Sequence, residues 1–202
     1  MSIRLLLADD QALVRGALGA LLGLESDLEV VAEVGRGDEV VGAAIEHGVH
    51  VCLLDIEMPG LDGIEVAARL TAEVPGCRSL VVTTFGRPGY VRRALEAGAS
   101  GFVVKDTPAR ELADAVRRVH AGLRVVDPAL AAESLAGGAN PLTDREAEVL
   151  REALGGATVA DIAAHLHLSP GTVRNYLSAA IGKTGSSTRV EAARTARSRG
   201  WI

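Results

Sequence analysis

The chain has 202 residues, of which 48% are hydrophobic and 23% are charged, and it carries a formal net charge of −5. This length suits two modest domains, and the balance of apolar and charged residues is typical of soluble globular proteins. No apolar run reaches the roughly 20 residues that a membrane-spanning helix needs, and the first residues lack the pattern of a secretory signal. We therefore expect a cytoplasmic protein with no membrane insertion.

The charge is divided unevenly along the chain. Residues 1–139 hold 13 Lys and Arg against 20 Asp and Glu, whereas residues 140–202 hold eight against six. The acidic part suits a cation, and the basic part can tolerate a polyanion such as nucleic acid. The basic excess is small, so charge permits DNA binding without demonstrating it.

The first 121 residues alternate strand-like apolar runs with helical patterns. Strands are predicted at residues 3–8, 29–34, 49–54, 79–84 and 101–104, and helices at 11–24, 38–47, 64–74, 89–97 and 108–120. Repeated strand–helix units predict a parallel sheet covered by helices on both faces. The expected fold class is α/β, with a doubly wound, five-stranded parallel sheet of order 2-1-3-4-5.

Acidic residues follow two of these strands. Asp9 and Asp10 come after the first strand, and Asp55 ends the third. In this strand order the first and third strands flank the switch point, where ligands bind, so the three carboxylates should converge. Clustered carboxylates repel one another, and a divalent cation such as Mg²⁺ relieves the repulsion. Asp55 is then a candidate nucleophile that forms an acyl phosphate, with the metal neutralising phosphoryl charge.

Two further strands end in residues that could bind a phosphoryl group. Thr83 and Thr84 end the fourth strand, and Lys105 ends the fifth. A hydroxyl and an ammonium are suitable partners for phosphoryl oxygens. Each residue alone has an ordinary explanation, since an Asp after a strand is usually a helix cap or a solvated loop residue. The combination indicates function.

The sequence contains two cysteines, Cys52 and Cys77. Two cysteines without a partner cluster predict neither a metal site nor a disulfide framework. Cys52 lies in an apolar run, where we expect it to behave as a small buried hydrophobe.

Residues 1–121 resemble the receiver domain of response regulators. The resemblance rests on residues 8–10 (ADD), 54–63 (LDIEMPGLDG), 82–85 (VTTF) and 97–106 (AGASGFVVKD). It implies that Asp55 is the phosphoacceptor and that Asp9, Asp10, Asp55 and the backbone carbonyl of Glu57 hold Mg²⁺. It also implies that Thr83 is the switch hydroxyl, that Lys105 pairs with the phosphoryl group, and that Phe102 is the aromatic residue that turns inward on activation.

The pattern weakens over residues 122–141, where turn signals predict a linker with one short helix at 129–135. From residue 142 onward every element is helical. Thr143 and Glu146 form the pattern of a capping box, a short helix follows at 159–166, and Ser169 with Pro170 begins a third helix that runs to about Lys183. A last helix is expected at 189–199. The two middle helices with their short connection predict a helix-turn-helix.

Residues 142–202 resemble the LuxR-type DNA-binding domain of the NarL/FixJ family. The matching stretches are residues 142–150 (LTDREAEVL), 162–163 (IA), 168–176 (LSPGTVRNY) and 189–193 (RVEAA). Arg and Asn side chains can read guanine and adenine edges in the major groove. The predicted DNA-contacting residues are Thr172, Val173, Arg174, Asn175 and Lys183.

The C-terminal part departs from the family pattern at two places. Val159-Ala160 stands where relatives often carry Asn-Lys, and Thr184 stands before Gly185 where Leu is usual. The first change removes a basic residue that would contact a phosphate. We therefore expect weak DNA binding by the monomer and a greater need for dimerisation.

These resemblances imply a two-component response regulator rather than an enzyme, with receiver domain 1–121, linker 122–141 and DNA-binding domain 142–202. The implied partners are a sensor histidine kinase that phosphorylates Asp55, promoter double-stranded DNA, and a second copy of the chain. The family suggests residues 13–22 and 112–119 as the dimer contact. Residues 83–90 (TTFGRPGY) further resemble the DesR-like subgroup, which senses membrane fluidity through a DesK-like kinase.

Three alternatives remain at this stage. A haloacid dehalogenase-type phosphatase also uses a strand-end Asp with Mg²⁺, but it needs a second Asp two residues later, where this chain has Glu57. An orphan regulator could use its receiver only for protein contacts. The C-terminal helices could also form a bundle that binds no nucleic acid.

Overall fold

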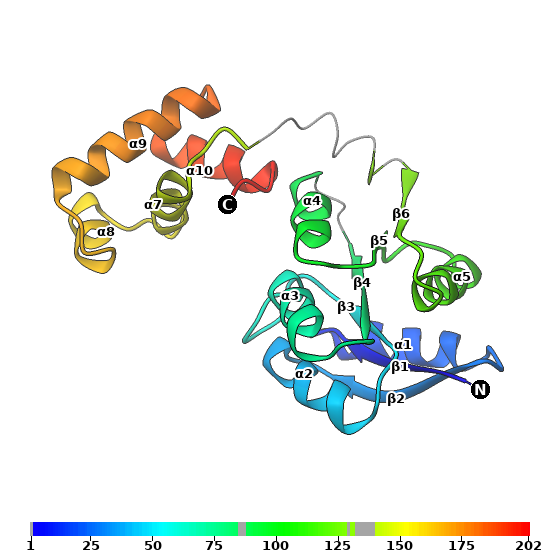
Figure 1. The fold of residues 1–202 in the computed structure, drawn as a ribbon. Helices are drawn as coiled ribbons and strands as arrows, with labels where there is room; N and C mark the ends of the chain where they lie inside the picture. Colours follow the sequence, from blue (N-terminus) through cyan, green and yellow to red (C-terminus); the bar gives the residue numbers. More distant parts are fainter. Residues whose placement is uncertain (1, 85–87, 129, 132–139) are drawn as a thin grey trace. The chain divides into compact units, whose positions relative to one another are not determined.

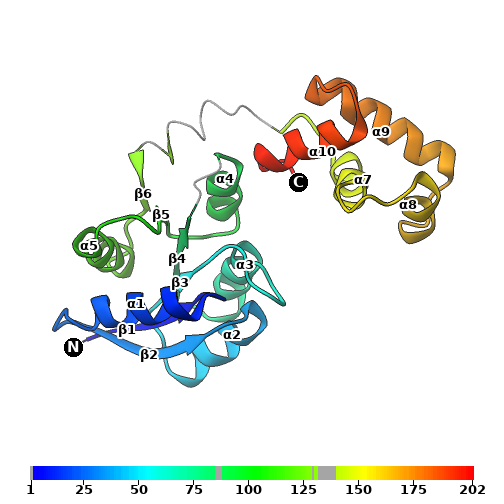
Figure 2. The same ribbon diagram turned by 180° about the vertical axis from the view of Figure 1, so that it is seen from behind.

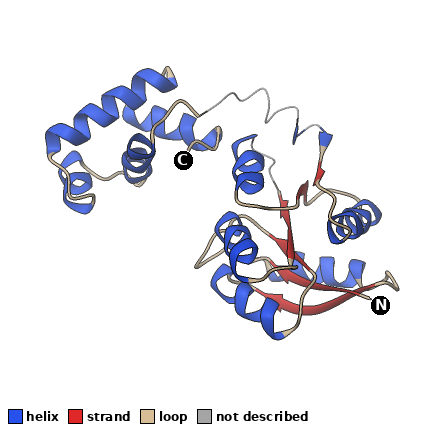
Figure 3. Ribbon diagram, viewed as in Figure 1, coloured by secondary structure: helices blue, strands red, loops and turns tan. Residues whose placement is uncertain are grey.

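A computed structural model describes residues 2–84, 88–128, 130–131 and 140–202 (Figure 1). The chain divides into two compact units, one built from Met1–Gly86 and Val91–Ala131 and the other from Ala132–Ile202 with Arg87–Tyr90. Figure 3 shows that all strands of the described residues belong to the first unit, whereas the second is helical. None of the helices in the described ranges combines the length and apolar character that crossing a bilayer requires.

The first unit is built on a parallel sheet of order β2-β1-β3-β4-β5-β6, which confirms the predicted doubly wound fold. Its strands are β1 (Ile3–Ala8), β2 (Leu28–Val34), β3 (Val51–Leu54), β4 (Arg78–Thr83), β5 (Gly101–Val104) and β6 (Val125–Val126). β1 lies between β2 and β3, so the switch point falls between β1 and β3, the two strands that lead into the acidic residues.

The sixth strand, β6, was not predicted and falls inside the expected linker. Two residues carry no periodic signal, so a strand of this length cannot be recognised from hydrophobic pattern. β6 pairs with the first half of β5 through Gly101↔Val125 and Phe102↔Val126. A Cβ atom on Gly101 would lie 2.7 Å from the carbonyl oxygen of Val125, so the absence of a side chain at Gly101 allows this close approach.

Five helices cover the sheet. They are α1 (Ala12–Leu22), α2 (Gly37–Glu46), α3 (Gly63–Glu73), α4 (Pro88–Glu96) and α5 (Ala109–His120). Buried residues of α1 and α5 pack on one face of the sheet, against alternate residues such as Leu5 and Leu7. The two views in Figures 1 and 2 place α2 and α3 on the other face. The apolar residues of the inner strands β1, β3 and β4 are buried on both sides, as the continuous apolar runs predicted, whereas the edge strand β2 is largely half-buried.

The second unit has a core of its own, formed by four helices: α7 (Asp144–Leu154), α8 (Val159–His165), α9 (Pro170–Thr184) and α10 (Arg189–Ser198). Val149, Leu150, Ile162 and Val173 lie at its centre, and Trp201 closes it from the C-terminus. The short helix predicted at residues 129–135 falls largely outside the described residues.

Helix N-termini differ between the two units. In the second unit each helix follows a Ser or Thr whose side chain accepts a hydrogen bond from a backbone N–H of the first turn: Thr143, Thr158, Ser169 and Thr188. Among α1, α2, α3 and α5, only α3 has such a cap, supplied by Asp62. Local sequence therefore defines the helices of the second unit more strongly than those of the first.

Candidate metal centre and nucleic-acid interface

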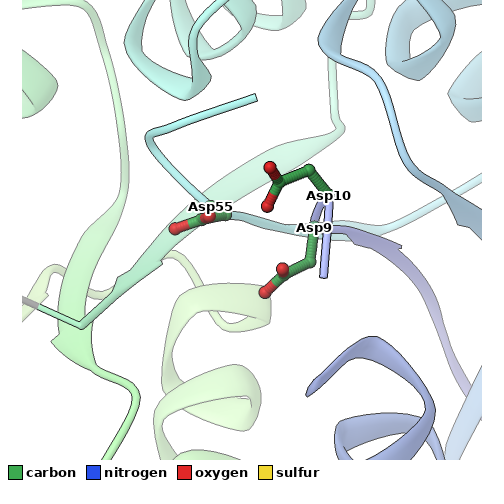
Figure 4. Close-up of side chains that lie close together, drawn as sticks. All are labelled: Asp9, Asp10 and Asp55. Carbon is green, nitrogen blue, oxygen red and sulfur yellow. The ribbon is translucent and has the colours of Figure 1, made fainter. Parts of the chain in front are cut away.

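Three carboxylates meet at the carboxyl ends of β1 and β3, as predicted (Figure 4). Asp9, Asp10 and Asp55 each offer an oxygen, and these oxygens all lie within 4.8 Å of one another. Asp9 and Asp55 are buried, whereas Asp10 is exposed. The parallel pairing of β1 with β3 brings them together, and the Asp55 N–H donates to the Ala8 carbonyl at 2.8 Å. Among the described residues this is the one cluster of three or more side chains suited to holding a metal ion.

Lys105 bridges the two buried carboxylates. Its Nζ lies 2.7 Å from Asp9 Oδ2 and 3.2 Å from Asp55 Oδ2. The backbone N–H of Lys105 donates to the Thr83 carbonyl at 2.7 Å, which fixes the lysine where β5 ends. The side chain was predicted to meet a phosphoryl group, and here it neutralises part of the acidic cluster.

The pKa values of this pair reflect burial and mutual interaction. Burial raises the pKa of Asp55 and the neighbouring Asp9 charge adds to this, so the Asp55 pKa stays above its ordinary value although Lys105 opposes the shift. Burial acts against the charged form of Lys105, but hydrogen bonds and charges from Asp9 and Asp55 outweigh it, and the Lys105 pKa is raised. One ammonium therefore does not fully compensate the carboxylates.

The donor set fits Mg²⁺. It consists of carboxylate oxygens, the ligands that this hard cation prefers, and the exposed side of the cluster at Asp10 leaves room for the water molecules that Mg²⁺ usually keeps. Glu57 lies two residues beyond Asp55 with an exposed side chain. That position is compatible with the expected contribution of Glu57 through its backbone carbonyl alone.

Two further predicted site residues lie in β4 and β5. Thr83 is buried at the end of β4, and Phe102 in β5 is fully buried, so this aromatic ring lies inward. Gly63 at the start of α3 was not among the predicted site residues, and its N–H donates to the Ile56 carbonyl at 3.0 Å. A Cβ on Gly63 would collide with the Asp55 carbonyl, so this glycine lets the α3 N-terminus pack against the loop that carries Asp55.

In the second unit, α8 and α9 contact each other and form the predicted helix-turn-helix. Arg174 and Asn175 are exposed near the start of α9, and Thr172 is half-buried with its hydroxyl 2.8 Å from Ser169 Oγ. Val173 is 0% exposed and its side chain packs in the core of the second unit, so its predicted contact with DNA, which stays a prediction, has no exposed side chain to use. The turn of the helix points Val173 inward while its neighbours point outward.

The structure gives Lys183 a partner within the protein. Its Nζ donates to Glu146 Oε2 at 2.7 Å, which links the last turn of α9 to the first turn of α7. Glu146 is buried and also accepts the Thr143 backbone N–H at 2.7 Å. Burial raises the pKa of Glu146, but the hydrogen bonds from Lys183 and Thr143 outweigh it, and the pKa is lowered. This contact gives Lys183 a structural role, and its predicted contact with DNA stays a prediction.

Thr184 occupies the position where an apolar residue was expected. Its hydroxyl donates to the Ala180 carbonyl at 2.8 Å, within the same helix. The hydroxyl of Thr184 is therefore satisfied within its own helix.

Comparison with known proteins matches both units. Residues 5–117 match the family model of the response regulator receiver domain, and residues 140–196 match that of bacterial regulatory proteins of the luxR family. The chain is 44% identical to the transcriptional regulatory protein DesR of Bacillus subtilis (strain 168) over 200 residues, covering 99% of each chain. It is 46% identical to the uncharacterized transcriptional regulatory protein YvfU of the same organism, covering 99% of this chain and 100% of that one.

Among solved structures, the chain resembles the response regulator ChrA of a heme-sensing two-component system. The TM-score is 0.60 and the sequence identity 34%, with 100% of this chain and 99% of that chain covered. A likeness to a complex of RcsB with DNA, at 23% identity and a TM-score of 0.69, supports the fold alone.

Proposed function

Because the chain belongs to the response regulators that join a receiver domain to a LuxR-type DNA-binding domain, we propose that phosphorylation of Asp55 by a sensor histidine kinase controls its binding to promoter DNA. The similar proteins are transcriptional regulators rather than enzymes, which argues against a phosphatase. The observation that carries the proposal is the acidic cluster of Asp9, Asp10 and Asp55 with Lys105 bridging two of its members.

In the proposed mechanism a carboxylate oxygen of Asp55 attacks the phosphorus of the kinase's phosphohistidine, the P–N bond breaks, and the imidazole of the kinase leaves. Asp9, Asp10 and Asp55, with the Glu57 carbonyl, would hold Mg²⁺, which neutralises charge on the phosphoryl group when bound. Lys105 leaves its contacts with the carboxylates and pairs with the phosphoryl oxygens, and Thr83 donates the hydrogen of its hydroxyl to the same group.

We also place the end of the receiver domain after Val126 rather than at residue 121, since β6 is part of the sheet, and keep the DNA-binding domain at residues 142–202.

The proposed DNA contact uses the exposed start of α9. If Arg174 makes a bidentate contact with a base, Arg174→Ala should weaken specific binding by about 1–3 kcal/mol and relax the preference at one base pair. The measurement is a titration of labelled promoter DNA at fixed salt, against matched and mutated sites. Arg69→Ala is the control, because it removes the same charge from an exposed site on α3. Equal affinity of Arg174→Ala and wild type would mean that Arg174 is merely solvated.

The proposed dimer contact centres on α1. Leu13 is 86% exposed and Leu21 45%, and Leu24 just beyond the helix is 81% exposed, so α1 and the residues after it leave three large apolar side chains open to solvent. On α5, by contrast, the apolar residues within 112–119 face the sheet and are buried. Exposed apolar side chains that gather on one surface are typical of protein–protein contacts.

We expect beryllofluoride, a phosphoryl mimic, to convert the wild-type protein to a dimer and to strengthen DNA binding. Once one DNA-binding domain of the dimer is bound, the DNA-binding domain of the other chain docks as an intramolecular event. Leu13→Asp should remain monomeric under the same conditions, since a charge replaces an exposed apolar contact. Sedimentation velocity measures the association state. Ile45→Asp, on α2 and 60% exposed, is the control and should dimerise like wild type. A Leu13→Asp protein that dimerises normally would exclude α1 as the contact.

A further inference from the structure

Two thiols that lie far apart in the sequence are in contact. Cys52 in β3 and Cys77, just before β4, place their sulfur atoms 3.5 Å apart. Both are free thiols. The register of β3 with β4 sets Cys52 beside Ser79, two residues beyond Cys77, so Cys52 and Cys77 lie on the same side of this strand pair. The proposed phosphorylation mechanism uses neither residue.

The two cysteines have different environments. Cys52 is fully buried within the sheet, whereas Cys77 is half-buried in the turn that follows α3. The Cys52–Cys77 hydrogen bond and burial raise the pKa of Cys52, while the same hydrogen bond lowers the pKa of Cys77 although burial opposes it. Cys77 is thus the thiol that more readily becomes a thiolate and the one that a small oxidant can reach.

We propose that Cys52 and Cys77 form a redox-active dithiol that peroxide converts to an intramolecular disulfide. The Cys77 thiolate attacks one peroxide oxygen, the O–O bond breaks, and the products are a Cys77 sulfenic acid and hydroxide, which takes up a proton to become water. The Cys52 sulfur then attacks the Cys77 sulfur, the S–O bond breaks, and the leaving hydroxide takes the Cys52 proton. The two thiols lose two protons and two electrons, and with these the peroxide is reduced to two water molecules.

Bond formation requires only a short movement. A disulfide bond is about 2.05 Å long, so the sulfur atoms must approach by roughly 1.5 Å from their present contact. Cys77 can supply this movement because it precedes β4 and is held by a turn bond from its N–H to the Val74 carbonyl at 3.1 Å, rather than by the sheet ladder. Cys52 stays in place within β3.

The test is oxidation of reduced full-length protein with hydrogen peroxide, followed by alkylation under denaturing conditions and peptide mapping. We expect a peptide pair linked through Cys52 and Cys77, a loss of both alkylatable thiols, and full recovery after dithiothreitol. In Cys52→Ser the sulfenic acid on Cys77 should persist and be trapped by dimedone. In Cys77→Ser the buried Cys52 should remain a thiol.

The proposal is overturned if wild type keeps both thiols after peroxide, if the links join different chains, or if Cys77→Ser is oxidised as fast as Cys52→Ser. The peptide map of the wild-type protein alone decides the question should either variant fail to fold, as judged by circular dichroism.

Discussion

Asp55→Ala is expected to abolish phosphorylation by acetyl phosphate in the presence of Mg²⁺, whereas wild type should gain one phosphoryl group per chain. The reason is that Asp55 directly follows β3 in the carboxylate cluster and contacts Lys105, and the family resemblance makes it the phosphoacceptor. Asp9 is also in the cluster and contacts Lys105, but the resemblance gives it the role of a metal ligand only. Intact mass spectrometry counts the groups, and hydroxylamine should remove them because an acyl phosphate is reactive.

Glu57→Gln provides a matched control for this experiment. Its side chain is exposed, and the expected contribution to Mg²⁺ comes from the backbone carbonyl, which the substitution preserves. The variant should therefore be labelled like wild type. Stable labelling of Asp55→Ala would disprove the assignment of the phosphoacceptor, and loss of labelling in Glu57→Gln would show that the Glu57 carboxylate itself takes part.

Lys105→Met is expected to lower the free energy of unfolding by about 3 kcal/mol at neutral pH without Mg²⁺, because it leaves Asp9 and Asp55 buried without their shared cation. Mg²⁺ should restore the variant more than it stabilises wild type. Chemical denaturation with and without Mg²⁺ measures both effects. Lys183→Met is the control: it also breaks a lysine–carboxylate pair, but away from the acidic cluster, so its loss of stability should not respond to Mg²⁺.

The effect of Lys105→Met should also depend on pH. The pKa of Lys105 is raised in the folded protein, so its stabilising contribution is fully present below the ordinary lysine pKa and is lost only as the pH rises through the folded value. The pKa of Asp55 is raised as well, and for a carboxyl group this means that ionisation in the folded state costs stability as the pH rises above about 4. The deficit of Lys105→Met should therefore be largest near neutral pH and shrink in acid, where the carboxyl groups are protonated. A deficit that is as large below the ordinary Asp pKa of about 4 as it is near neutral pH would contradict this account.

The sequence was sufficient to predict the acidic cluster because strand periodicity and strand order together determine where strand ends meet. Asp9, Asp10 and Asp55 needed no information beyond the positions of β1 and β3. β6 could not be predicted, since its two residues become a strand only through pairing with β5, which depends on the missing side chain of Gly101. Such long-range pairing leaves no local signal.

The surroundings of two residues on α9, Val173 and Lys183, could not be predicted for a similar reason. Val173 lies within a motif of the family. A motif alone does not separate residues that contact DNA from residues that fill the core, and the side chain of Val173 packs in the core among the other helices. The partner of Lys183 is 37 residues away in sequence, at Glu146, where only a capping role was visible. The contact between Cys52 and Cys77 was likewise hidden, because it depends on the register of β3 with β4.

The uneven distribution of helix caps has a consequence for how the chain acquires its structure. In the DNA-binding domain each helix carries its own start signal within three or four residues, so the early steps need only local contacts. In the receiver domain β1 must find β3 with Leu5 opposite Val51, and chains dominated by such distant pairings fold slowly. The receiver domain leaves the ribosome first, yet we expect its sheet to fold more slowly than the helices of the DNA-binding domain. The DNA-binding domain can therefore be folded while the receiver domain is still assembling.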